Sequence, residues 1–137
     1  MHIRITDDGN EHDIHEIHEM LRDYNLRHRE ASETVPLGVF LEDETGRKFA
    51  GLTGETFGNW LCIWFLFVGE AFRGQGLGSR LLEAAENEAR QRGCKYAFVD
   101  TFSFQAPAFY EKHRYREVFT LEDYPYTEKR HYYTKAL

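Results

Sequence analysis

The stretch EAFRGQGLGSRLLEAAENEARQRG, residues 70–93, carries the clearest structural signal in this chain. Gly74, Gly76 and Gly78 alternate directly before an amphipathic helical pattern that ends near Gly93. A helix N-terminus carries unpaired N–H groups and the positive end of a dipole, and glycines let an anion approach that backbone. The stretch therefore predicts a phosphate-binding turn at the start of a helix.

Two familiar phosphate-binding motifs do not fit this loop. A P-loop needs Lys followed by Ser or Thr after its last glycine, whereas Gly78 is followed by Ser79 and Arg80. The dinucleotide pattern G-x-G-x-x-G also fails, because its third glycine is misplaced whether it is counted from Gly74 or from Gly76. A turn that only ends a strand stays open as the alternative, although three glycines cost conformational entropy there.

Length and composition predict one globular domain over residues 1–137, since 42% of the residues are hydrophobic and 15% are aromatic. The net charge of −6 argues against nonspecific nucleic-acid binding. No apolar run reaches the ~20 residues of a membrane span, and the N-terminus lacks a signal-peptide pattern. Cys62 and Cys94 lack metal or redox spacing, and Cys62 is expected to be a core thiol. We expect a cytoplasmic protein without a metal or structural disulfides.

Sequence periodicity predicts an α/β fold with a mixed sheet. Apolar residues at helical spacing predict a first helix that Asn10 or Asp13 would cap. The apolar run 60–68 is typical of a central strand buried on both faces, and a parallel crossover follows it. Further strands are predicted at residues 2–6, on either side of a turn at 43–46, and at 94–102, 115–121 and 130–137, with a short helix near 106–115.

Two segments resemble the GNAT superfamily of N-acetyltransferases, from about Leu37 onward. RGQGLG, residues 73–78, is similar to its acyl-CoA pyrophosphate loop, Arg/Gln-x-x-Gly-x-Gly/Ala, and AFYEKHRY, residues 108–115, is similar to its A-x-x-FYEKxGF segment. The resemblance, to a small bacterial-type acetyltransferase, implies a GNAT fold. That fold is a mixed, mostly antiparallel sheet of about seven strands, flanked by helices, whose two central parallel strands splay apart.

The resemblance implies acetyl-CoA as the cosubstrate. The backbone amides of residues 75–79 would hold its pyrophosphate, Arg73 would open the loop, and pantetheine would insert between the splayed strands. The residues implied to bind it are Leu66, Phe67, Val68, Arg73, Gly74, Gln75, Gly76, Leu77, Gly78, Ser79, Ser103 and Tyr110. The chain departs from the family at Ser103, where many members have Asn, and at Arg114, where Gly is usual. It also lacks the Glu that many members carry on the central strand as general base.

Three side chains are candidates for the chemistry. Tyr110 aligns with the family tyrosine that donates a proton to the CoA sulfur, and its alternative role is core packing. An acceptor amine is mostly protonated at pH 7 and must lose a proton before it attacks. Asp100, at the end of a strand bordering the expected acyl site, is the first candidate for the base, or else a loop anchor. Glu55 is the second candidate, and a water chain without a single base is the third.

The resulting hypothesis is transfer of acetyl from acetyl-CoA to a primary amine of a small molecule or peptide, by direct attack in a ternary complex. No cysteine is placed as an acyl carrier. The alternative is a catalytically silent acyl-CoA-binding module. A metal site on His12, His15 and His18 is disfavoured because i, i+3 spacing drifts around a helix. The aromatic segment 123–133 would rim an acceptor pocket or form a homodimer contact.

Overall fold

The computed structural model describes residues 1–30 and 33–137, which divide into two compact units, Met1–Ser32 and Glu33–Leu137. The first unit contains α1 (Glu11–Leu26), and the Asn10 side chain caps it by accepting from the N–H groups of His12 and Asp13. The predicted strand at residues 2–6 is wrong, because a strand needs a hydrogen-bonded neighbour and none of the sheet strands pairs with this segment. Organisation as one domain stays a prediction.

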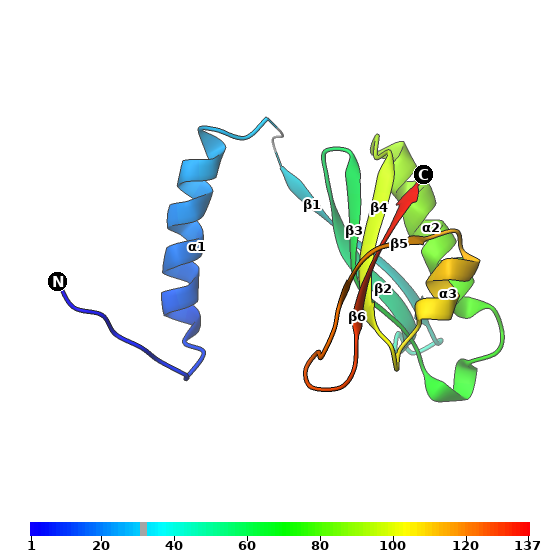
Figure 1. The fold of residues 1–137 in the computed structure, drawn as a ribbon. Helices are drawn as coiled ribbons and strands as arrows, with labels where there is room; N and C mark the ends of the chain where they lie inside the picture. The colour runs from blue at the N-terminus through cyan, green and yellow to red at the C-terminus, as the bar shows by residue number, and fades with distance from the viewer. Residues whose placement is uncertain (31–32) are drawn as a thin grey trace. The chain divides into compact units, whose positions relative to one another are not determined.

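The described part of the second unit contains six strands, two α-helices and a 3₁₀ turn. They are β1 (Thr34–Glu42), β2 (Lys48–Phe57), β3 (Trp60–Val68), η1 (Glu70–Phe72), α2 (Leu77–Gln91), β4 (Tyr96–Phe102), α3 (Pro107–Lys112), β5 (Arg116–Leu121) and β6 (Arg130–Ala136). The strand order is β1-β2-β3-β4-β6-β5, with β3 and β4 parallel and the other neighbours antiparallel (Figure 1). The predicted mixed, mostly antiparallel sheet is confirmed, with six strands rather than about seven.

Helices α2 and α3 cover the same face of the sheet (Figure 1). The core lies beneath them, where Leu81, Leu82 and Ala85 of α2 are buried. The prediction that β3 is buried on both faces is wrong, because Phe65 and Phe67 are 72% and 62% exposed. The two helices shield one face only, and no other described helix of this unit covers the opposite face.

The strand β3 leaves its neighbour β4 partway along its length. Parallel pairing stops at the pair Ile63–Val99. On the other side of β3, the register with β2 shifts beside Gly54, so that Trp64 is an extra residue in a β-bulge. A side chain at Gly54 would overlap the carbonyl oxygen of Cys62, and the bulge therefore requires glycine there. The bulge and the interrupted pairing form the splay that the resemblance implied.

Candidate active site

The glycine loop presents a run of free backbone donors at the start of α2. The N–H groups of Gln75 through Ser79 have no hydrogen-bond partner among the described residues, and the Arg80 N–H is the first to bond back, to the Gly76 carbonyl at 3.2 Å. Gly74 and Gly76 adopt φ values of 80° and 73°, which side-chain-bearing residues adopt only with strain. Unpaired donors at the positive end of a helix dipole can bind an anion.

A side chain joins this loop to the end of β3. The Arg73 Nε donates to the Val68 carbonyl at 3.0 Å, and its guanidinium lies 5.5 Å from the centre of the Phe67 ring. The loop therefore starts directly beside the last residues of the splayed strand.

A hollow of about 630 Å³ lies at the splay. Because pairing with β4 stops at Ile63, the backbone of residues 66–68 faces this hollow without a strand partner on that side. The hollow is lined by Trp64, Phe65, Leu66, Phe67, Val68, Arg73, Gly78, Asp100, Thr101, Phe104, Gln105, Ala106, Phe109 and Tyr110. The structure thus brings together most of the predicted site residues that lie outside the glycine loop.

One of three buried tyrosines has a free hydroxyl. The hydroxyls of Tyr115 and Tyr133 donate to Glu86 at 2.8 Å and to Glu111 at 2.9 Å. The Tyr110 hydroxyl has no hydrogen-bond partner in the described part of the chain, and Tyr110 lines the hollow. Burial, and then the charge of Asp100, raises the pKa of Tyr110 to about 12. Tyr110 is therefore a neutral proton donor at neutral pH.

The two candidate bases differ in their partners. The Arg130 Nε donates to the Asp100 carboxylate at 2.7 Å, and the Arg130 Nη1 donates to the Tyr124 hydroxyl at 3.1 Å. The side chain of Glu55, on β2, has no hydrogen bond or ion pair with any described residue. Protonation of Asp100 would break its ion pair, whereas protonation of Glu55 would break none. Sequence reasoning missed Arg130, since it is 30 residues from Asp100 in the chain.

Cys62 lies beside Glu55 in the sheet rather than in the core, contrary to the prediction. It pairs with Glu55 across β2 and β3, and it is half-buried. Burial raises the pKa of the Cys62 thiol, and the charges of Glu55 and Asp100 raise it further. The thiol stays protonated at neutral pH, which makes it a poor nucleophile. Asp100 lines the hollow at the splay, whereas Glu55 and Cys62 do not, and Cys62 is still paired with Phe98 of β4.

Of the two nearby residues Ser103 and Gln105, only Gln105 lines the hollow at the splay. The Ser103 hydroxyl lies 2.8 Å from the His131 Nε2, and Ser103 does not line the hollow. Gln105 does line it, and its Oε1 accepts from the Phe102 N–H at 2.9 Å. The cosubstrate-binding role of Ser103 stays a prediction. Arg114 adopts the left-handed conformation expected at this glycine position, with φ of 71°.

Two further findings concern metals and membranes. Within residues 1–30 and 33–137, no three His, Cys, Asp or Glu side chains are grouped to hold a metal ion, those of His12, His15 and His18 included. No described helix combines the length and apolar character that a membrane span requires.

Comparisons with known proteins agree with this geometry. The model of the acetyltransferase (GNAT) family matches residues 3–115. The chain is 38% identical over 98 residues to the acetyltransferase Atu2258 of Agrobacterium fabrum, covering 72% of each chain. It is 40% identical over 104 residues to the blasticidin-S acetyltransferase of Streptomyces morookaense, covering 73% of this chain and 76% of that protein.

Solved structures show the same similarity. A crystal structure from Agrobacterium tumefaciens, of a protein assigned as an acetyltransferase, matches with a TM-score of 0.95 and 31% identity over all of both chains. A crystal structure of an acetyltransferase from Bacillus cereus matches with a TM-score of 0.84 and 34% identity, again over all of both chains. The glycine loop, the splayed strands and these similarities lead to one conclusion: this chain belongs to the GNAT acetyltransferase family.

Proposed function

We propose that this protein transfers the acetyl group of acetyl-CoA to the primary amine of a small molecule or peptide. The observation that carries the proposal is that a row of free backbone donors lies next to a hollow with a free tyrosine hydroxyl. Five successive unpaired N–H groups, residues 75–79, stand beside a hollow that holds the free Tyr110 hydroxyl. The loop suits the pyrophosphate of the cosubstrate, and the backbone of residues 66–68, which has no partner on β4, suits the amides of its pantetheine arm.

In this proposal Tyr110 protonates the departing thiolate. The hydroxyl is neutral at pH 7 and is not committed to another acceptor, unlike those of Tyr115 and Tyr133. The C–S bond of the thioester breaks as the C–N bond to the amine forms, and the Tyr110 proton passes to sulfur. The nitrogen, positively charged after attack, releases a further proton, and this proton restores the Tyr110 hydroxyl. Cys62 carries no acyl group, because its thiol is protonated at neutral pH.

In this proposal Glu55 receives the proton that the acceptor ammonium loses. Its carboxylate is unpaired, whereas Asp100 is held by Arg130. Asp100 then contributes negative charge beside the amine and orients Arg130. Asp100 on the lining of the hollow and Glu55 on β2, opposite Cys62, favour a cationic acceptor. The rings of Phe98 and Tyr132, 6.0 Å apart, supply a flat surface on the neighbouring strands β4 and β6. The relationship to the blasticidin-S acetyltransferase supports a small-molecule amine among the acceptor classes.

The test is an acetylation screen. Purified protein is incubated with acetyl-CoA and a panel of antibiotic amines, polyamines, amino acids and peptides, and products are identified by mass. A product that carries one acetyl group, together with CoA release, is the expected result. Binding of CoA without transfer to any amine would instead support the silent acyl-CoA-binding module.

A further inference from the structure

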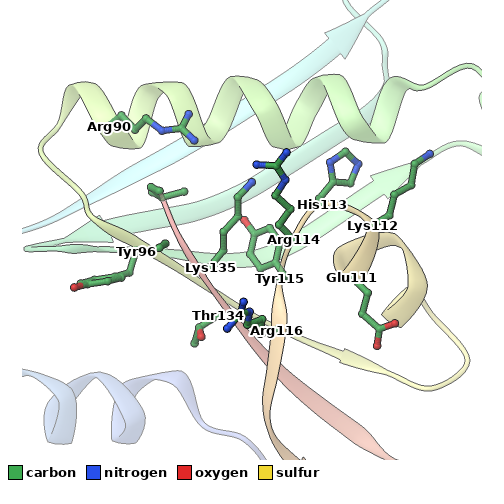
Figure 2. Close-up of a pocket in the computed structure, with 12 residues that line it drawn as sticks. Arg90, Tyr96, Glu111, Lys112, His113, Arg114, Tyr115, Arg116, Thr134 and Lys135 are labelled. Atoms are coloured by element: carbon green, nitrogen blue, oxygen red, sulfur yellow. The ribbon is translucent and has the colours of Figure 1, made fainter.

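A second hollow, of about 1110 Å³, lies between α2, the end of α3 and β6 (Figure 2). It does not share a lining residue with the hollow at the splay. Five cationic side chains line it, those of Arg90, Lys112, Arg114, Arg116 and Lys135, against one carboxylate, that of Glu111. This concentration of positive charge stands out in a chain whose net charge is −6.

Most of these cations are not neutralised within the protein. Lys135 is the exception among the five: its charge is neutralised, because its Nζ lies 2.9 Å from both carboxylate oxygens of buried Glu86. Lys112, Arg114 and Arg116 have no ion pair with any described residue, and Arg90 bonds to the neutral side chain of Asn87. Exposed like charges held close together repel one another, and a bound anion would remove that repulsion.

The cationic hollow reaches the first turn of α2. His113 lines the hollow, and its Nε2 lies 2.8 Å from the Ser79 hydroxyl. Ser79 also ends the run of unpaired N–H groups. Figure 2 shows Lys112 and His113 beside the N-terminal half of α2, whereas Arg90 lies near its other end. A ligand whose phosphates sit on the glycine loop can therefore place a further phosphate among these cations.

Resting on the proposed function, we propose that Lys112 and Arg114 bind the 3′-phosphate of the acetyl-CoA whose pyrophosphate occupies the glycine loop. That group is a doubly charged anion beyond the pyrophosphate, and ammonium and guanidinium donors make short, charge-assisted bonds to phosphate. The two side chains flank His113, which contacts the loop helix directly. Arg116 lines the same hollow from β5, outside this trio, and serves as the matched control.

The experiment compares two ligands, CoA and 3′-dephospho-CoA, by titration calorimetry without an acceptor. For the native protein, the Kd for 3′-dephospho-CoA is expected to exceed the Kd for CoA about tenfold. Lys112→Gln and Arg114→Gly are each expected to reduce this ratio severalfold by weakening CoA binding, with 3′-dephospho-CoA binding unchanged. Arg116→Gln is expected to preserve the ratio. Glycine suits the left-handed conformation of residue 114, so Arg114→Gly removes the cation without disturbing the fold.

The outcomes separate the two proposals. Equal Kd values for the two ligands in the native protein would overturn the 3′-phosphate site and leave the proposed function intact. The same holds if the ratio survives in both Lys112→Gln and Arg114→Gly, or falls equally in Arg116→Gln. Absence of binding by either ligand would overturn the site together with acetyl-CoA as cosubstrate.

Discussion

The guanidinium of Arg130 donates to the carboxylate of Asp100 at 2.7 Å and to the hydroxyl of Tyr124 at 3.1 Å. Arg130, the first residue of β6, therefore connects Asp100 of β4, at the splay, with Tyr124 in the segment that precedes β6. The contact also distinguishes Asp100 from Glu55, the two carboxylates that are candidates for the base. Asp100 has a permanent cationic partner, and Glu55 has none among the described residues.

Glu55→Gln is expected to lower kcat about 10²-fold, the typical contribution of a positioned base, with the KM for acetyl-CoA little changed. Asp100→Asn is the matched variant, and we expect a smaller fall in kcat together with a higher KM for the amine. The measurement is steady-state kinetics across pH with the amine found in the screen. A larger kcat effect for Asp100→Asn than for Glu55→Gln would reverse the assignment.

Arg130→Gln is expected to raise the KM for the amine more than the KM for acetyl-CoA, because the Asp100 carboxylate loses the contact that holds it in position. If Arg130 acts through Asp100, the double variant with Asp100→Asn should have a KM for the amine no higher than that of Asp100→Asn alone. A partly exposed ion pair of this kind couples by about 1 kcal/mol. Independent, additive effects of the two substitutions would contradict a shared role.

Tyr110→Phe is expected to lower kcat about 10²-fold while binding of acetyl-CoA stays nearly unchanged. Tyr115→Phe and Tyr133→Phe are matched controls, since each removes the hydroxyl of an equally buried ring. They are expected to cost stability, about 1 kcal/mol each for the lost hydrogen bond, and to leave kcat near the native value. An unchanged kcat in Tyr110→Phe would exclude the acid role.

The raised pKa of Tyr110 also predicts a loss of stability in alkaline solution. The folded-state pKa of about 12 exceeds the ordinary value of 10.0, so the folded protein holds this proton more tightly than the unfolded chain. Stability from this group is complete below pH 10 and is lost as the pH rises toward 12. Urea unfolding between pH 9 and 12 should show a shallower decline for Tyr110→Phe than for the native chain. Parallel declines would show that Tyr110 does not hold its proton in this way.

Gly76→Ala is expected to weaken CoA binding severalfold and to lower the free energy of unfolding by about 1 kcal/mol, because φ at this position is 73°. Gly93→Ala is the control, with φ of 90° at the other end of α2. It should cost similar stability and leave CoA affinity at the native value. Equal losses of affinity in both variants would mean that strain alone, and not the loop, is responsible.

Features that depend on neighbouring residues were predictable from the sequence. The Asn10 cap, the turn at 43–46 and the glycine loop each follow from a few consecutive residues, and each lies where it was expected. The strand predicted at residues 2–6 failed because alternation describes a side-chain pattern but does not supply a pairing partner.

Features that depend on register or on distant contacts were not predictable. The nine residues of β3 are apolar on both faces, and only the position of α2 and α3 decides which face is buried. The bulge depends on how β2 aligns with β3, and the Arg130–Asp100 contact joins segments that are far apart in the chain. The identity of Tyr110 came from resemblance. Among the three buried tyrosines its hydroxyl is the free one because Glu86 and Glu111 bind the other two, and only the folded chain brings these residues together.

The bulge at Trp64 is equivalent to the insertion of one residue into a regular strand. Leu61 and Ile63 face the helices before it, and Leu66 and Val68 pack against the same core after it, a spacing that two-residue alternation alone would not produce. Deleting Trp64 would restore unbroken alternation with the same four side chains inward. One residue therefore lets β3 keep its inward side chains on both sides of the bulge, beside the point where its pairing with β4 stops.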